Sequence, residues 1–135
     1  MSNLLSYFIA GPENLLPNHI NKSENPNKAL VRIVGELAEN GLDVFQLRAK
    51  SINDNEIIDL IRDLSSATYN TKMKLCINDN VQVVNKLSKY VDILHIGQND
   101  MKPELAKNQI SSKVKIGLSI TNLDQIQNIP NFINY

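Results

Sequence analysis

The sequence lacks several of the features by which common protein classes are recognised. It has no tryptophan, one cysteine, five glycines and five prolines among its 135 residues. The single cysteine, Cys76, excludes an internal disulfide and a cysteine-based metal cluster. No Gly-rich phosphate loop, Ser-His-Asp order or zinc-ligand spacing is present. The pattern of secondary structure, rather than a signature motif, therefore carries the information on function.

An excess of charge of one sign and a long apolar run are also missing. Fourteen basic and fourteen acidic residues give a net charge of zero, so no global positive field attracts nucleic acid or an anionic membrane. The apolar start over residues 4–10 is broken by Ser6, and its length fits neither a signal peptide nor a membrane span. A hydrophobic content of 42% is typical of a globular domain. We therefore expect a soluble, cytoplasmic protein that forms one domain over residues 1–135.

Short apolar runs alternate with amphipathic segments along the whole chain. The predicted strands are 6–10, 44–48, 74–77, 93–96 and 114–119, with 132–135 as the first residues of a sixth. The predicted helices begin near Asn27, Asn53, Asp79 or Asn80, Pro103 and Asn122. Ser51-x-x-Asp54 resembles a capping box. This alternation predicts an α/β fold with a parallel sheet, and both an open doubly wound sheet and part of a (β/α)₈ barrel fit it.

Polar residues follow the predicted strands at their carboxyl ends, where β-α folds place their active sites. They are Gln46, Arg48 and Lys50 at the end of the second strand, Asn78 and Asp79 after the third, Asp100 after the fourth and Ser119 at the end of the fifth. Strand alternation predicts that Gln46, Arg48 and Lys50 share one face. Arginine and lysine suit an anion, and two carboxylates suit Mg²⁺, which borrows phosphate oxygens as ligands. The set predicts a site for a diphosphate ester with Mg²⁺.

Structural explanations for the same residues stay open. The three residues after the second strand could form the solvated face of an edge strand. Asp79 and Asp100 could each cap the helix that follows, and Ser119 could be a turn residue. His95 lies in an apolar strand, which is more typical of a packed, hydrogen-bonded histidine than of a catalytic base or a metal ligand. Cys76 is interpreted as a buried small hydrophobe.

Four short stretches, in chain order, resemble the thiamine phosphate synthase family. They are Gln46-Leu-Arg48-Ala-Lys50, Ile77-Asn78-Asp79, His95-Ile-Gly97-Gln98-Asn-Asp100 and Ile116-Gly117-Leu-Ser119. The family is a (β/α)₈ TIM barrel that transfers a hydroxymethylpyrimidine group from its diphosphate to a thiazole phosphate and releases pyrophosphate. The resemblance therefore implies a magnesium-dependent transferase of thiamine biosynthesis with small-molecule substrates.

The resemblance also implies a role for each strand-end residue. It assigns the diphosphate to Arg48, Lys50, Asn78 and Ser119, Mg²⁺ to Asp79 and Asp100, and the pyrimidine side of the substrate to Gln46. The implied mechanism is dissociative, with Arg48 and Lys50 stabilising the charge that develops on the leaving diphosphate. No general base is obligatory in such a reaction.

The family continues past the sixth strand with further phosphate-binding turns, so the resemblance covers five β-α units of an incomplete barrel. Five units cannot close an eight-stranded barrel, and unpaired strand edges promote self-association. We therefore expect an incomplete copy that is inactive alone. A non-catalytic diphosphate-binding module and a thiazole tautomerase-like protein are the alternatives. The retained Gln-x-Arg-x-Lys and Gln-x-Asp signatures favour the synthase branch over the tautomerase.

Overall fold

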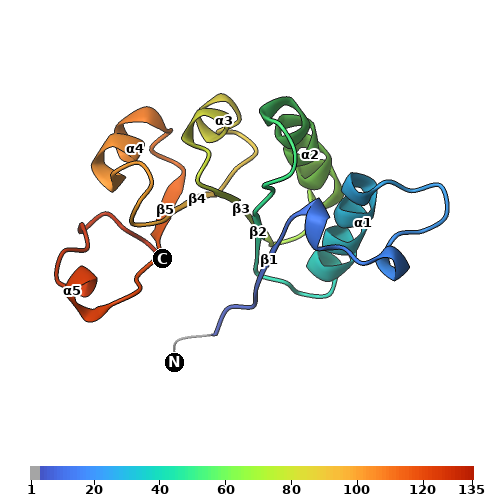
Figure 1. The fold of residues 1–135 in the computed structure, drawn as a ribbon, viewed down its shortest axis with the longest axis horizontal. Helices are drawn as coiled ribbons and strands as arrows, with labels where there is room; N and C mark the ends of the chain where they lie inside the picture. The colour runs from blue at the N-terminus through green and yellow to red at the C-terminus, as the bar shows by residue number, and fades with distance from the viewer. Residues whose placement is uncertain (1–3) are drawn as a thin grey trace. The chain divides into compact units, whose positions relative to one another are not determined.

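The computed structural model describes residues 4–135, which contain five strands alternating with helices (Figure 1). By its internal contacts the chain divides into two compact units, Met1–Leu75 and Cys76–Tyr135. The strands are β1 (Tyr7–Ala10), β2 (Val44–Leu47), β3 (Lys74–Asn78), β4 (Ile93–Ile96) and β5 (Lys115–Leu118). The α-helices are α1 (Pro26–Glu39), α2 (Asp54–Ala67), α3 (Val81–Lys86), α4 (Pro103–Gln109) and α5 (Leu123–Ile126). Two 3₁₀ turns, η1 (Pro12–Asn14) and η2 (Pro17–His19), precede α1.

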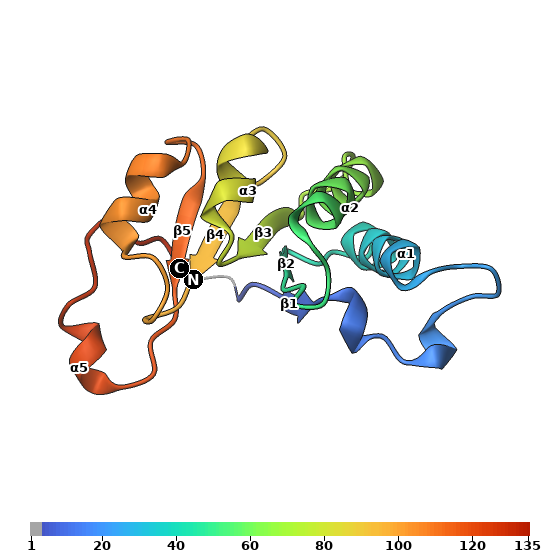
Figure 2. The same cartoon turned by 45° about the horizontal axis from the view of Figure 1, so that its top comes forward.

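The first unit is built around a parallel pair of strands. β1 pairs with β2 in register from Tyr7 opposite Val44 to Ala10 opposite Leu47. Helices α1 and α2 pack side by side, as Figure 2 shows, and contribute fully buried leucines to the core. Phe45 is fully buried, and its ring lies 5.7 Å from that of Phe8 between centroids. Burial of these apolar side chains is the main source of stability in this unit.

The second unit has the same parallel arrangement. Within it β3 pairs with β4 and β4 pairs with β5, so the strand order follows the chain. Ile93, Leu94 and Ile96 are fully buried, and α3 packs against α4. A sequential order of parallel strands is typical of winding in one direction, as in a (β/α) barrel, rather than of a doubly wound sheet.

Asparagine side chains begin most of these helices. The amide oxygens of Asn25, Asn53, Asn80 and Asn122 accept hydrogen bonds from backbone N–H groups in the first turns of α1, α2, α3 and α5. Two predicted helix caps are therefore wrong. Asn25 rather than Asn27 caps α1, because Pro26 takes the first helical position. The capping box of α2 joins Asn53 to Glu56 rather than Ser51 to Asp54.

The α/β fold class predicted from the sequence is confirmed. Residues 4–135 contain five strands, fewer than the eight of a closed barrel. The predicted sixth strand is not assigned as a strand within the described residues, but its last two residues lie along β5. Asn134 N donates to Ile116 O at 2.9 Å, and Leu118 N donates to Tyr135 O at 3.1 Å. Over the described part of the chain, none of the helices combines the length and apolar character needed to cross a membrane.

Candidate functional site

In the first unit, the predicted basic residues follow the end of β2. The strand ends at Leu47, and Arg48 N continues the pairing with one further bond to Ala10 O at 3.0 Å. Arg48 and Lys50 are exposed in the loop beyond. Gln46 is only 2% exposed, and its Oε1 accepts a 3.2 Å hydrogen bond from the Tyr7 hydroxyl. The prediction that these three residues share one strand face is therefore wrong, because the strand stops before Arg48.

A carboxylate from the loop after β1 contacts this basic segment. Glu13 lies in η1, and its Oε1 accepts a hydrogen bond from Lys50 N at 2.7 Å. Its Oε2 accepts a second bond from Ser51 Oγ at 3.2 Å. Partial burial raises the pKa of Glu13, but the hydrogen bonds from Lys50 and Ser51 and the charge of Arg48 lower it, with a net shift below its ordinary value. Glu13 is therefore ionised at neutral pH and lies close enough to Arg48 for the charge of that residue to lower its pKa.

In the second unit, Asn78 and Asp79 form the carboxyl end of β3. Asn78 Nδ2 donates to Asp79 Oδ2 at 2.7 Å, and Asp79 N donates to His95 O at 2.8 Å. Asp79 has a positive φ of 61°. Residues other than glycine, asparagine and aspartate rarely adopt this left-handed backbone conformation. The cap of α3 is Asn80, whose Oδ1 accepts from Val83 N at 3.0 Å. Helix capping therefore does not explain Asp79.

The residues after β4 and β5 meet around His95. Its Nε2 and Ser119 Oγ are 2.8 Å apart, a hydrogen-bond distance that confirms the predicted hydrogen-bonded histidine. Asp100 Oδ2 accepts from Gly97 N at 2.6 Å, which folds the loop after β4 back on itself. Helix α4 begins at Pro103 without a side-chain cap, so Asp100 is not its cap. Gln98 Nε2 donates to Ser119 O at 2.7 Å and ties the two loops together.

The electrostatic environment of His95 has two opposing contributions. Burial lowers the pKa of the imidazole, and the nearby Asp100 carboxylate raises it, with a net shift below its ordinary value. A neutral imidazole has one donor and one acceptor nitrogen, so Nε2 can accept a hydrogen bond from Ser119 Oγ or donate one to it. In the second unit, Asp79 N bonds to the backbone oxygen of His95, Ser119 Oγ bonds to its ring, and the Asp100 carboxylate is near enough to raise its pKa.

The two predicted magnesium ligands are carboxylates at the ends of β3 and β4. Within residues 4–135, no group of three or more histidine, cysteine, aspartate or glutamate side chains is arranged to hold a metal ion. Mg²⁺ does not require such a group, because it keeps several waters and shares phosphate oxygens with one or two carboxylates. The donor chemistry of Asp79 and Asp100 fits such an ion.

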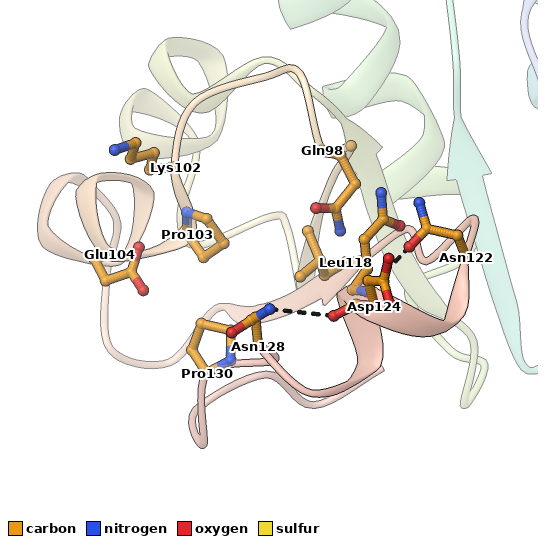
Figure 3. Close-up of a pocket in the computed structure, with 11 residues that line it drawn as sticks. Gln98, Lys102, Pro103, Glu104, Leu118, Asn122, Asp124, Asn128 and Pro130 are labelled. Carbon is orange, nitrogen blue, oxygen red and sulfur yellow. Dashed lines mark hydrogen bonds between the residues drawn. The ribbon is translucent and has the colours of Figure 1, made fainter.

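A cavity of about 420 Å³ lies beside this cluster, between the loops that follow β4 and β5 (Figure 3). Four residues with amide side chains contribute to its wall: Gln98, Asn122, Gln125 and Asn128. Figure 3 shows Asn128 held by a bond to the backbone of Asp124, which is 3.1 Å long. None of the predicted diphosphate or metal residues of this unit lines the cavity. Gln98 lines the cavity and also donates to Ser119 O, so this residue connects the cavity to the cluster around His95.

The comparisons with known proteins identify the family. A family model described as thiamine monophosphate synthase matches residues 18–132. The chain belongs to the thiamine monophosphate synthase family. The match contains the ends of β2, β3, β4 and β5, and with them every residue predicted for the site.

Relatives named thiamine-phosphate synthase support the assignment to the thiamine monophosphate synthase family. The Staphylococcus saprophyticus protein is 31% identical over 127 residues, which cover 92% of this chain and 54% of that protein. The Oceanobacillus iheyensis protein is 31% identical over 130 residues, covering 94% and 56%. A solved thiamine phosphate pyrophosphorylase from Pyrococcus furiosus superposes with a TM-score of 0.70 at 24% identity, over 92% of this chain and 54% of that one. That structure supports the fold. The chain spans about half the length of the relatives it matches.

Sequence reasoning passed over two residues of this synthase-family chain that the structure places near the predicted site. Glu13 was included in a polar loop, although it lies three residues beyond the end of β1. The rule that active-site residues follow the carboxyl ends of strands could have selected it. His95 was interpreted as a packed, hydrogen-bonded residue, and no sequence pattern indicated that its partner would be Ser119.

Proposed function

We propose that this chain binds the diphosphate-bearing pyrimidine substrate of a thiamine phosphate synthase, with Mg²⁺, at the carboxyl ends of its strands. One observation carries the proposal. The family match runs through the ends of four strands, and the polar residues predicted at those ends are all present. Anion-binding and metal-binding side chains are costly in a dry core, so a solvent-accessible site at the strand ends suits these residues.

In this proposal the diphosphate is bound by cations and neutral donors together. Arg48 supplies a planar fork that matches two phosphate oxygens, and Lys50 supplies a point charge. Both side chains are exposed and thus accessible to a ligand. The Asn78 amide and the Ser119 hydroxyl add neutral hydrogen bonds. Gln46, held by Tyr7, contacts the pyrimidine side of the substrate.

Asp79 and Asp100 would hold Mg²⁺ through carboxylate oxygens. Each carboxylate is already oriented by a hydrogen bond, from Asn78 in one case and from Gly97 N in the other. Both side chains are exposed and thus accessible to an ion. When bound, the ion supplies positive charge to the diphosphate oxygens.

The reaction that follows is a transfer of the hydroxymethylpyrimidine group. The bond between the pyrimidine methylene carbon and the diphosphate oxygen breaks, and its electron pair leaves with pyrophosphate. The thiazole nitrogen then donates its lone pair to the methylene carbon. Arg48 and Lys50 stabilise the charge that accumulates on the leaving group, which is the electrostatic contribution that usually dominates such steps. The self-association predicted from unpaired strand edges stays a prediction, as does a cytoplasmic location.

Calorimetric titration with inorganic pyrophosphate, with and without MgCl₂, tests the proposal. We expect Mg²⁺-dependent binding that is weakened about tenfold or more in Asp79→Ala and Asp100→Ala, because each removes a charge-assisted contact. The matched control is Asp63→Ala, which removes an exposed aspartate of the same charge from α2. Arg48→Ala should weaken binding similarly, and Lys72→Ala, an exposed cation that precedes β3, should not.

One outcome of the titration would contradict the proposal. Pyrophosphate binding that is indifferent to Mg²⁺ and to all the site variants would refute the assigned site. A second measurement separates a transferase from a non-catalytic diphosphate-binding module. The chain is incubated with the pyrimidine diphosphate, the thiazole phosphate and MgCl₂, and the joined product is assayed. Product formation that is lost in Asp79→Ala would rule out the non-catalytic module.

A further inference from the structure

Glu13 stands apart from the residues to which the proposed function gives a role. It is a carboxylate immediately beside the segment that carries Arg48 and Lys50, two residues proposed to bind an anion. A negative charge placed there competes with an anionic ligand for the same cations. Its presence calls for a physical reason other than ligand binding.

The hydrogen bonds of Glu13 supply that reason. Both carboxylate oxygens bind the loop after β2, one through Lys50 N at 2.7 Å and the other through Ser51 Oγ at 3.2 Å. The turn that carries Glu13 is itself fixed, because Gly11 N donates to Asn14 Oδ1 at 2.7 Å and Asn14 N donates to Gly11 O at 3.0 Å. The loop after β1 therefore holds the loop after β2 at two points.

Gly11 lets the two loops approach so closely. A Cβ atom at this position would overlap with Arg48 O and with the Glu13 carboxylate. The backbone of Arg48 thus lies directly against the turn, and Arg48 N bonds to Ala10 O at 3.0 Å. Together these contacts fix the backbone from Arg48 to Ser51, while the Arg48 and Lys50 side chains stay exposed.

We propose that Glu13 is a positioning residue, which holds the Arg48–Lys50 segment in the conformation that binds the diphosphate. The inference rests on the proposed function, since it assumes that Arg48 and Lys50 bind that group. It gives Glu13 two effects of opposite sign. Its hydrogen bonds favour ligand binding by ordering the segment before the ligand arrives, and its charge opposes binding.

The two effects can be separated by two substitutions. Glu13→Gln keeps an oxygen that can accept from Lys50 N and removes the charge, so pyrophosphate should bind as tightly as to the unmodified chain, or more tightly. Glu13→Ala removes the charge and both hydrogen bonds, so binding should weaken about tenfold. If Glu13 acted through its charge alone, both variants would bind pyrophosphate more tightly. The control is Glu39→Ala, an exposed glutamate at the end of α1.

Titration calorimetry with pyrophosphate and MgCl₂ is the primary measurement, and amide hydrogen exchange at Lys50 is the second. Exchange at Lys50 N should be faster in Glu13→Ala than in Glu13→Gln, with similar thermal unfolding midpoints for both variants. Equal or tighter pyrophosphate binding by Glu13→Ala, when the unmodified chain binds, would overturn the positioning role alone. An unmodified chain that does not bind pyrophosphate would overturn the diphosphate site, and the positioning role with it. Unchanged exchange at Lys50 in Glu13→Ala would overturn the positioning role whatever the ligand does.

Discussion

Replacement of Gly117 by alanine should destabilise the second unit, because β5 has no room for a side chain there. Gly117 is buried and lies opposite His95 in the parallel pair β4–β5. A Cβ at this position would lie 2.7 Å from His95 Nδ1, about 0.7 Å inside the 3.4 Å at which ordinary van der Waals contact begins. The imidazole has to turn to make room, and its Nε2 then leaves Ser119 Oγ.

The size of the effect follows from two opposing contributions to the free energy of unfolding. Overpacking in a well-packed region costs about 1–3 kcal/mol. Alanine restricts the unfolded chain more than glycine does, which stabilises the folded state by about 0.4–1 kcal/mol. The net expectation is a destabilisation of about 1–2 kcal/mol, which corresponds to a fall in Tm of roughly 3–10 °C for a chain of this size.

Urea and thermal unfolding followed by circular dichroism measure this effect. The matched control is Gly35→Ala in the middle of α1, where the new Cβ would lie 3.7 Å from Ala67 Cβ, an ordinary contact. Alanine favours the helix by about 1 kcal/mol over glycine, so this variant should be more stable than the unmodified chain. A Gly117→Ala midpoint at or above that of the unmodified chain would refute the overpacking argument.

Two further predictions concern the cluster around His95. The pKa of His95 is lowered by burial, partly offset by Asp100, so the folded state binds fewer protons than the unfolded state below about pH 6.5. The free energy of unfolding should therefore fall as pH drops from about 6.5 toward the folded pKa. In His95→Gln the unfolding midpoint should lose this pH dependence. An unchanged pH dependence in the variant would show that His95 is not the group responsible. Asp79→Gly should be at least as stable as the unmodified chain, because glycine adopts a φ of 61° without steric cost, yet it should lose Mg²⁺-dependent pyrophosphate binding. Clear destabilisation with binding retained would reverse that interpretation.

The alternation of apolar runs and amphipathic segments was enough to predict the elements of the fold. Each predicted strand over β1 to β5 is confirmed to within one residue at either end, because buried parallel strands read as short apolar runs. The residue at which β2 ends could not be predicted from the sequence. Gln46, Arg48 and Lys50 alternate in sequence as a strand would, and nothing local indicates that pairing stops at Leu47.

The candidate site was predicted in its residue types and not in its contacts. Asp79, Asp100 and Ser119 lie in the segments that follow β3, β4 and β5, as the sequence indicates, and their ligand roles stay predictions. The contacts of His95 and Glu13 could not be predicted, because each depends on tertiary distances between loops that are 24 to 38 residues apart in sequence. The positive φ of Asp79 has no sequence signal beyond the general tolerance of aspartate for that conformation.

The asparagine caps have a consequence for how the protein responds to acid. A carboxylate cap loses its charge below about pH 4, whereas an amide has no proton to gain there. The starts of α1, α3 and α5 therefore keep their side-chain hydrogen bonds as the solution is acidified. Asp43 behaves differently: its Oδ2 binds Ser6 N at 2.7 Å and Ser6 Oγ at 2.8 Å, and these bonds lower its pKa. Acid should thus loosen the tether between the segment before β1 and the segment before β2 while these helix N-termini remain intact.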